Sequence, residues 1–449
     1  MKKLAFLLTW GYLLTASHVF AQESLDLEKA IQIGLENNLQ IKIGVENIAL
    51  RDLDEKIGVG TFFMPTINGT YQRSFATEDV TQTFVNDPEN PRQIDNAKSR
   101  NKSYSFVGIY GFRPESIVTM KRLGVLSEVS ELDSKVIVEN TVAGISTAYY
   151  LLILQLQRYK VLKETLSLSK ARLDIAQAQY ELGGAGKRDF LTAQVDYNSD
   201  SSLLITQEQI IQNSRVNLNE LLAIDPDKEF LLQDSTIEIG DPLSLETLTE
   251  NAFIENKLLL VNQRLNNEAY LQIRELQASR LPVINLNSSF TNQVFNSDAG
   301  FLIQNERQGI NYGGNVTLNL FSGLTLNRRI QSAKVNKRIQ DYSLEQYEIQ
   351  LRSDIQRAYN IYAKNQQLLK IEQVNYQVAK ENSEIALERF RLGIASYLEF
   401  RDAQVNLLTA ENRLITAIFS IKEQEIELMR LSGKIFFENS MMEFQLPEN

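Results

Sequence analysis

The chain of 449 residues contains no cysteine, one histidine and one tryptophan. These two residues are His18 and Trp10, so residues 22–449 contain neither type. Without histidine, this part of the chain cannot build a Ser-His-Asp triad or an imidazole general base. Without cysteine and histidine it has no ordinary zinc ligands, and it forms no disulfide. Only carboxylate, lysine or tyrosine chemistry remains open to an enzyme, and we expect neither a cofactor nor a metal centre.

Residues 1–21 have the pattern of a secretory signal peptide. Lys2 and Lys3 precede an apolar stretch over 4–14, and Val19-Phe20-Ala21 is the expected cleavage site. The apolar stretch is too short for an ordinary membrane-spanning helix, so we expect the segment to be cleaved after export. The whole chain has a net charge of −10, which disfavours nucleic-acid binding because phosphate contacts need clustered Lys and Arg.

Proline is scarce, and its eight positions divide the chain because proline interrupts helix interiors. The spans 115–225 and 283–446 contain none, and both are rich in strong helix formers. The pattern predicts helices over 27–62, 115–182, 188–222, 245–280, 326–392 and 398–432. Strands are expected over 65–75, 103–112, 282–294 and 311–321. The polar segment 76–102 contains two of the prolines and is predicted to be a mobile surface loop.

One motif occurs twice, 210 residues apart. It reads AQYELGGAGKRDFLTAQVD from Ala178 and ERFRLGIASYLEFRDAQVN from Glu388. A fixed offset of this size indicates two copies of a whole structural unit, and therefore an internal duplication. We expect a signal peptide over 1–21, a first repeat over 22–240, a second over 241–433 and a C-terminal tail over 434–449.

The expected strands alternate apolar and polar residues, as in VINLNSSFTN from Val283 and NVTLNLF from Asn315. This alternation is typical of barrel strands that face lipid on one side and a wet lumen on the other. Four strands cannot close a barrel, and an open sheet edge is not tolerated in lipid, so closure requires several chains. Aromatic residues could form interfacial girdles or pack between strands: Tyr71, Phe75, Tyr104, Phe106, Tyr110, Phe290 and Phe295.

Three duplicated features together carry a resemblance to a known family over about 25–432. They are the Leu-x-Leu-Glu openings at Leu25 and Leu243, the Met64-Pro65 and Leu281-Pro282 pairs, and the two aromatic-x-Leu-Gly turns followed by Ala-Gln. In their order and spacing they resemble the TolC-type outer-membrane factors. The resemblance implies a mixed α/β membrane protein of mostly long α-helices that form a tunnel. It also implies four β-strands per chain in a trimeric, 12-stranded transmembrane β-barrel.

The same resemblance implies a function without catalysis. The homotrimer would lie in the outer membrane and extend into the periplasm. It would be the exit duct of a tripartite efflux or type I secretion system, passing substrates received from a periplasmic adaptor and an inner-membrane transporter of the RND or ABC type. Outer-membrane lipid would surround the barrel, and nucleic acid would not be a partner. The transported substrate, the identity of the adaptor and transporter, and the use of protons or ATP are not determined by the sequence.

The two Leu-Gly turns are the first candidate site. Leu182-Gly183 and Leu392-Gly393 have the pattern of helix C-caps. The resemblance implies that these turns also contact the adaptor.

Two carboxylates form the second candidate site. Glu399 and Asp402 are three residues apart and share a helix face. The resemblance places them in an acidic ring at the periplasmic entrance, which would favour cations. The alternative is an ordinary solvated acidic face.

Gating residues follow from the resemblance alone. The family's latch joins a Tyr and an Arg near the second turn to an Asp near the first. Asp189 keeps the Asp, whereas Phe390 and Ala395 stand at the Tyr and Arg positions. Neither can make the latch's hydrogen bond, so we expect a looser entrance. Arg391 or Arg401 could substitute.

Two other functions fit parts of the sequence. A periplasmic coiled-coil adaptor or scaffold without a channel would also contain long helices, although adaptors usually carry one helical hairpin and compact β domains. A carboxylate-based hydrolase would need a compact pocket, and the sequence shows no pattern that builds one.

Overall fold

The computed structural model describes residues 24–184 and 186–435. The expected signal peptide and all but two residues of the expected tail lie outside the described residues. The helices are α1 Leu27–Asn37, α2 Leu39–Phe63, α3 Glu115–Glu181, α4 Lys187–Leu221, α5 Leu245–Glu255, α6 Lys257–Ala278, α7 Thr325–Arg391 and α8 Tyr397–Leu431. The strands are β1 Ser24–Leu25, β2 Thr66–Phe84, β3 Asp87–Phe112, β4 Leu231–Leu232, β5 Val283–Ser297 and β6 Gln304–Thr317.

The long helices are confirmed, and their lengths match between the two halves of the chain. Helices α3 and α7 have 67 residues each, and α4 and α8 have 35 each. The first helix of each half is broken, contrary to the sequence prediction. Asn38 separates α1 from α2 and Asn256 separates α5 from α6, both with extended ψ angles of 123° and 114°. The Asn256 side chain accepts a hydrogen bond from the Leu259 amide at 2.9 Å, so it caps the helix that follows.

The predicted loop over 76–102 is wrong. Strands β2 and β3 continue through most of this segment, and they pair from Thr66 with Ile109 out to Phe84 with Asp87. The backbone ladder extends beyond the apolar part of the hairpin, where side-chain alternation no longer reveals the strand. Strand β6 also differs from its prediction, since it starts earlier, at Gln304, and its ladder ends at Thr317.

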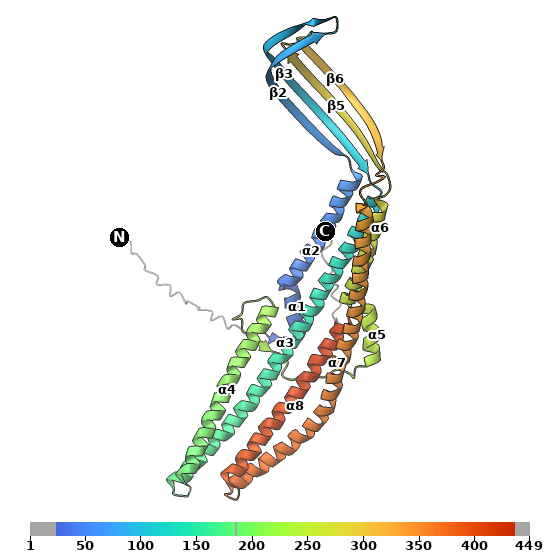
Figure 1. Cartoon of the computed structure of the whole chain (residues 1–449). Helices are drawn as coiled ribbons and strands as arrows, with labels where there is room; N and C mark the ends of the chain where they lie inside the picture. The colour runs from blue at the N-terminus through green and yellow to red at the C-terminus, as the bar shows by residue number, and fades with distance from the viewer. Residues whose placement is uncertain (1–23, 185, 436–449) are drawn as a thin grey trace, which may run out of the picture. The chain divides into compact units, whose positions relative to one another are not determined.

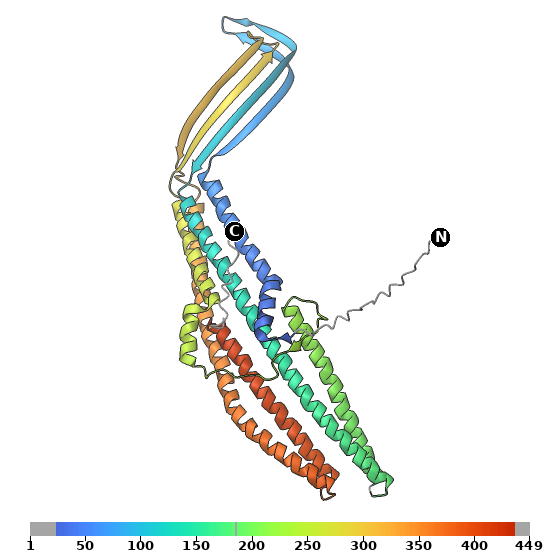
Figure 2. The same cartoon turned by 180° about the vertical axis from the view of Figure 1, so that it is seen from behind.

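The described residues divide into two compact units, each made of segments from both halves of the chain. Unit 1 comprises 24–39, 138–248 and 355–435, and unit 2 comprises 40–137 and 249–354. These units group segments that pack together, whereas the predicted repeats are contiguous ranges of the chain. The division therefore does not test the repeat boundaries, which stay a prediction. Figures 1 and 2 show α4 beside α3 and α8 beside α7 within unit 1.

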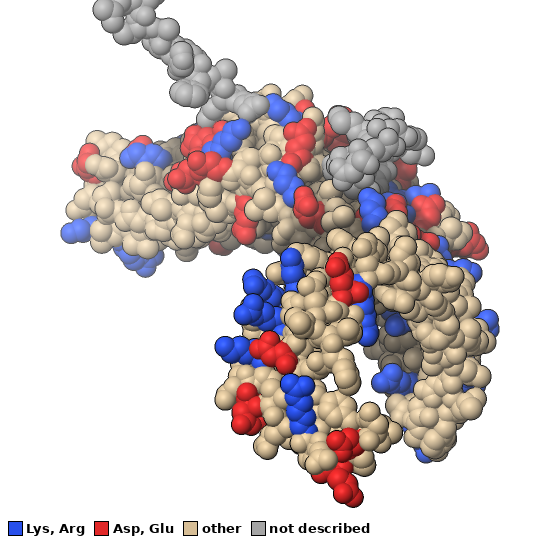
Figure 3. Space-filling view, turned by 90° about the horizontal axis from the view of Figure 1, so that it is seen from above, with Lys and Arg blue, Asp and Glu red and all other residues tan. Residues whose placement is uncertain are grey.

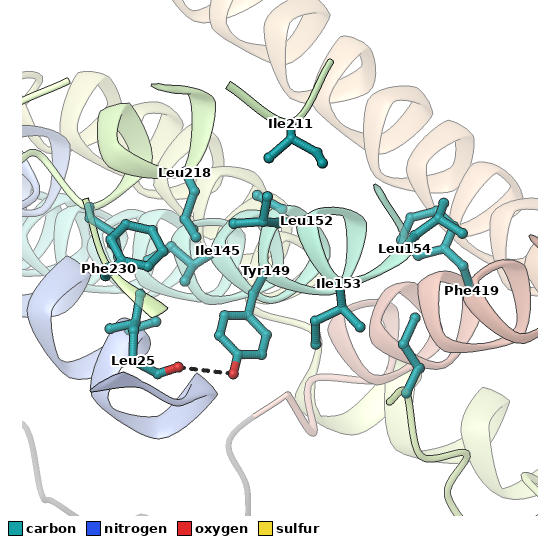
Figure 4. Packing of buried hydrophobic residues seen from close by; sticks show 14 of the residues in the cluster. Leu25, Ile145, Tyr149, Leu152, Ile153, Leu154, Ile211, Leu218, Phe230 and Phe419 are labelled. Atoms are coloured by element: carbon teal, nitrogen blue, oxygen red, sulfur yellow. Dashed lines mark hydrogen bonds between the residues drawn. The ribbon is translucent and has the colours of Figure 1, made fainter. Parts of the chain in front are cut away.

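Unit 1 has an apolar core around the middle of α3. Ile145, Tyr149 and Leu152 of α3 are buried there, with Leu218 of α4 and Phe419 of α8 in the same cluster. The Tyr149 hydroxyl donates to the Leu25 carbonyl at 3.2 Å, which anchors the start of the described chain (Figure 4). By length and composition α3 could cross a membrane, but 61% of its most apolar window is buried, so we interpret it as a core helix.

Unit 2 contains a four-stranded antiparallel sheet in the order β2-β3-β5-β6, visible in Figure 1. Helices of the same unit are joined by Arg122 of α3, whose guanidinium lies 3.1 Å from Glu268 and 2.8 Å from Glu275 of α6. Within the described residues, β2 and β6 each pair on one side only. The sheet therefore has two open edges, each with a row of unpaired backbone groups.

The sheet has two chemically different faces, because residues directly opposite each other in the register point to the same side. The apolar face carries Ile67, Tyr71, Tyr104, Phe106, Tyr110, Phe112, Ile284, Leu286, Phe290, Ile310, Tyr312 and Val316. The polar face carries Asn68, Thr70, Gln72, Ser103, Ser105, Asn285, Asn287, Ser289, Thr291, Gln293, Asn311 and Asn315. Of the seven predicted girdle aromatics, Phe295 lies on the polar face and the other six on the apolar face.

Candidate functional site

Each helical hairpin of unit 1 closes with a Leu-Gly turn. Gly183 and Gly393 have φ angles of 75° and 71°, the left-handed conformation that glycine adopts without strain. Their amides donate to the carbonyls of Tyr180 and Phe390 at 3.1 and 3.0 Å, which confirms the predicted helix ends. Leu182 and Leu392 are 87% and 72% exposed, so neither serves as a buried contact of its own turn.

A pair of stacked aromatic rings packs beside each of the two turns. Tyr180 stacks on Phe190 with ring centroids 5.8 Å apart, and Phe390 stacks on Phe400 at 5.5 Å. These pairs occupy matching positions of the duplicated motif. Their environments differ, because Phe390 and Phe400 are buried in a cluster that includes Ile175 of α3, whereas Tyr180 is 39% exposed.

A polar network joins α3, α4 and α8 close to these turns. We call it the tip network, and it consists of Thr165, Ser169 and Arg172 of α3, Asp196 and Asp200 of α4, and Tyr397, Arg401 and Gln404 of α8. On each helix its members are spaced by three or four residues, so they line one face. The network links helices of the first half of the chain to α8 of the second half.

The strongest contact of the tip network is between Arg401 and Asp200. The guanidinium donates to both carboxylate oxygens, at 3.1 and 3.2 Å. Asp200 is 2% exposed and also accepts a hydrogen bond from the Ser169 hydroxyl. This bidentate pair of hydrogen bonds fixes the rotation of α8 about its axis as well as its distance from α4.

Arg172 is the second cation of the tip network, and its side chain is fully buried. It donates to Gln404 at 3.0 Å and to Asp196 at 3.3 Å, and its guanidinium lies 4.8 Å from the centre of the Tyr397 ring. Its Nε has no hydrogen-bond partner. Burial lowers the pKa of this guanidinium from its ordinary value, yet an arginine stays charged in proteins.

Two cations thus face two carboxylates in the tip network. Tyr397 completes the arrangement by donating its hydroxyl hydrogen to Asp196. Burial, followed by this hydrogen bond, raises the pKa of Tyr397. Buried ion pairs add little net stability, but removing one partner costs about 3–5 kcal/mol because the other charge stays buried. The tip network therefore holds one arrangement of the three helices and penalises others.

The predicted gate residues do not all meet in this structure. Phe390 and Ala395 are both buried in the apolar cluster beside the tip network. Asp189 lies in the first turn of α4, with the exposed Arg188 as its ion-pair partner at 3.8 Å. Arg391 pairs with Glu388 on its own helix at 2.8 Å. Of the two arginines considered as substitutes, Arg401 binds carboxylates of the first hairpin.

The two predicted ring carboxylates have different surroundings. Glu399 lies 3.2 Å from Arg389, which offsets its charge. Asp402 is exposed and forms no ion pair within the described residues. In the part of the chain that the structure describes, no three acidic, histidine or cysteine side chains are grouped as metal ligands.

The sequence analysis missed most of the tip network. Asp196, Asp200 and Arg172 were not singled out, because their partners lie on other helices up to 232 residues away. One signal was available, since polar residues recur at three- or four-residue spacing on each helix. Matching Gln404 with Gln194 did not reveal the difference between them, since Gln404 is buried and Gln194 is exposed.

Comparisons with known proteins show which sequences and folds this chain is similar to. Residues 248–434 match the model of a family described as outer membrane efflux protein. The match covers less than half of the chain, which is similar to outer membrane efflux proteins over these residues. The resemblance to TolC-type outer-membrane factors is thereby confirmed, as is the location in the outer membrane with an extension into the periplasm.

Two relatives from Pseudomonas putida are 22% identical to this chain over 429 residues, which is 92% of this chain and 84% of theirs. They are a probable efflux pump outer membrane protein, TtgC, and an antibiotic efflux pump outer membrane protein, ArpC.

Solved structures of low sequence identity show the same fold. The CmeC outer membrane channel of Campylobacter jejuni is 16% identical, with a TM-score of 0.77 over 92% of this chain and 86% of that chain. The outer membrane protein VceC of Vibrio cholerae is also 16% identical, with a TM-score of 0.73 over 91% of this chain and 96% of that chain.

Proposed function

We propose that three copies of this chain form the outer-membrane exit duct of a tripartite efflux pump. The observation that carries the proposal is the four-stranded sheet with an apolar face, a polar face and two open edges. An apolar outer face suits lipid, and a polar inner face suits a wet lumen. In lipid the two edges must pair, and a second copy of the same chain has the complementary edge.

The internal duplication supports a specific pairing of these edges. Thr66 pairs with Ile109 in the first hairpin, and Val283 pairs with Thr317 in the second, so Thr66 corresponds to Val283 and Ile109 to Thr317. The two hairpins join within the chain through β3 and β5, where Val107 lies opposite Ser289. By the same correspondence, Asn315 of β6 would lie opposite Gln72 on β2 of the next chain.

The helical turns support the same conclusion independently. Ile175 of α3 packs on the second turn, and its counterpart in the duplication is Ile385 of α7, which is 52% exposed. Tyr180 of the first turn is likewise left exposed. We infer that Ile385 of a neighbouring chain covers the first turn, so that each chain completes the next.

Isolation of the protein from cell envelopes tests the proposed function. The duct predicts a heat-sensitive oligomer in the outer-membrane fraction that gives long-lived pores in planar lipid bilayers. A soluble periplasmic species without conductance would favour the coiled-coil adaptor or scaffold instead. The face seen in Figure 3 offers no support for nucleic-acid binding, since its acidic and basic side chains are interspersed with wide uncharged areas.

Replacing both exposed turn leucines by aspartate, Leu182→Asp with Leu392→Asp, is expected to abolish export and leave bilayer conductance unchanged. An apolar anchor at an interface centre is worth about 2 kcal/mol or more, so adaptor affinity should fall by at least about tenfold. The measurement pairs export in cells with conductance of the purified protein. Export at the wild-type level would contradict adaptor contact through these leucines.

We expect Asp402→Asn to lower the preference of the pore for cations more than Glu399→Gln does. The reason is that Arg389 already offsets the charge of Glu399, while Asp402 has no ion-pair partner within the described residues. Reversal potentials under a salt gradient measure the preference. Equal reversal potentials for the wild type and both variants would support a solvated acidic face in place of an entrance ring.

A further inference from the structure

Basic residues interrupt the apolar face of the sheet toward its hairpin end. They are Arg73 of β2 and Lys98, Arg100 and Lys102 of β3. Arg73 lies directly opposite Lys102 in the register, and Arg100 lies opposite Phe75, one step further along. Directly opposed side chains are about 5 Å apart at Cβ and diagonal ones about 7–8 Å, so three cations gather on two strands.

Within the described residues, no carboxylate of β2 or β3 lies directly opposite a member of this cationic cluster. Like charges directly opposite each other destabilise a sheet, and none of the four residues forms an ion pair within the described residues. The one acidic residue in the same row, Glu306 of β6, lies beyond Val294 and therefore about 10 Å from Lys102. An anion from outside the chain would offset the repulsion between these opposed cations.

The position of the cluster indicates which anion this is. The apolar face of β3 runs from Phe112 to Tyr104, about 27 Å along the strand and about 20 Å in depth at a tilt of ~40°. This is close to the ~25 Å apolar band of an outer-membrane barrel, and Lys102 is the next residue on that face. Cations directly beyond an apolar band lie at the depth of lipid headgroups.

Aromatic rings at this boundary hold two of the cations against the sheet. The Arg73 guanidinium lies 4.9 Å from the centre of the Phe75 ring, and the Lys102 ammonium lies 5.2 Å from that of Tyr104. Both side chains thus keep their charge beside the sheet, where one anion can bind both of them at once.

A shallow groove of about 550 Å³ lies on the apolar face below the cluster. It is lined by small residues, including Gly108 and Ser288, and by larger ones, including Ile67, Tyr110, Leu286 and Tyr312. Gly108 and Lys102 are six residues apart on β3, which at the same strand tilt is a separation of about 15 Å along the membrane normal. This equals about half of a ~30 Å hydrocarbon core, so one acyl chain could reach from the cluster to the groove.

We propose that this face binds a phosphorylated lipid of the outer leaflet, with headgroup phosphates on Arg73, Arg100 and Lys102 and an acyl chain in the groove at Gly108. The assignment rests on the proposed function, which places the hairpin end of the sheet at the outer surface. Bound lipid neutralises the opposed cations and adds apolar contacts in the groove, so it stabilises the barrel.

Native mass spectrometry of the purified full-length oligomer tests this site, with diphosphoryl lipid A as the probe. The wild type is expected to retain the probe through washing with neutral detergent. The variant R73Q/R100Q/K102Q should retain it at least about tenfold less, because the headgroup phosphates lose three charge-assisted hydrogen-bond donors. Gly108→Phe fills the groove without changing the charge, and it should also weaken retention.

The matched control is R92Q/R307Q, which removes cations from β3 near its hairpin and from the polar face, and it should retain the probe normally. Equal retention by the wild type and R73Q/R100Q/K102Q would overturn the proposal, as would equal retention of a dephosphorylated probe. If free pyrophosphate raised the melting temperature of the oligomer as much as diphosphoryl lipid A does, the cluster would be a site for soluble anions and the lipid proposal would be wrong. Any of these three results, obtained with an oligomer that still conducts, contradicts the lipid site alone. A wild-type protein that forms no pore contradicts the proposed function as an exit duct.

Discussion

Replacing Arg401 by glutamine is expected to open the periplasmic end of the reconstituted duct and raise its single-channel conductance. In the wild type, Arg401 donates to both oxygens of Asp200, a carboxylate that is 2% exposed. Glutamine leaves this charge without its main partner, at a cost of about 3–5 kcal/mol. A penalty of that size shifts the balance between joined and separated helices by about 100-fold or more. Conductance should rise, and protease should cut more readily near the Gly183 and Gly393 turns.

Arg413→Gln is the matched control for this prediction. Arg413 lies on the same helix and pairs with Glu372 at 3.0 Å, but its side chain is 52% exposed. Exposed pairs contribute about 0–1 kcal/mol, so this variant should behave like the wild type. The double variant R401Q/D200N removes the unpaired charge and should recover part of the closed state. Identical conductance of R401Q and R413Q would exclude the tip network as a latch.

The family's latch positions and the observed tip network differ in a way that single residues explain. Phe390 and Ala395 cannot form the latch's hydrogen bonds, and in this structure they build an apolar cluster instead. The hydrogen bonds to the first hairpin come instead from Tyr397 and Arg401, a few residues further along the chain. Tyr397 donates to Asp196 and Arg401 donates to Asp200. A looser entrance, which the resemblance alone predicts, is therefore not required by these contacts.

The sequence was sufficient for the order of elements because each long helix is locally encoded. Proline-free spans of strong helix formers predicted α3, α4, α7 and α8. It was insufficient where tertiary contacts override local pattern. Asn38 and Asn256 interrupt their helices although neither is proline or glycine, and the extended β2–β3 ladder relies on backbone pairing that leaves no apolar alternation to read.

For the candidate site, the sequence located the turns but did not predict how the helices pair. The Leu-Gly turns follow from glycine chemistry at two positions, Gly183 and Gly393. The tip network depends on which face of α8 meets α3, and helix periodicity alone leaves that open. Gln404 is buried because it contacts Arg172 and Thr165 of α3, in the other hairpin, whereas Gln194 at the matching position is exposed within the described residues.

A cysteine pair across the open edges of the sheet is expected to link the chains covalently. The proposed pairing of the edges would place Gln72 of one chain opposite Asn315 of the next, as Val107 lies opposite Ser289 within the chain. Opposed strand residues have Cβ atoms about 4.5–5.5 Å apart, near the range that a disulfide spans. The chain contains no cysteine, so any disulfide in Q72C/N315C comes from the introduced pair.

This cross-link is the most direct test of closure by several chains, which is the central claim. After oxidation, Q72C/N315C should migrate as a covalent trimer on a denaturing gel, and reduction should return it to single chains. The control S74C/N315C shifts one cysteine by two residues, to about 7–8 Å, and should cross-link poorly. Monomers from Q72C/N315C in the outer membrane, or equal cross-linking by both variants, would contradict the proposed pairing of the edges.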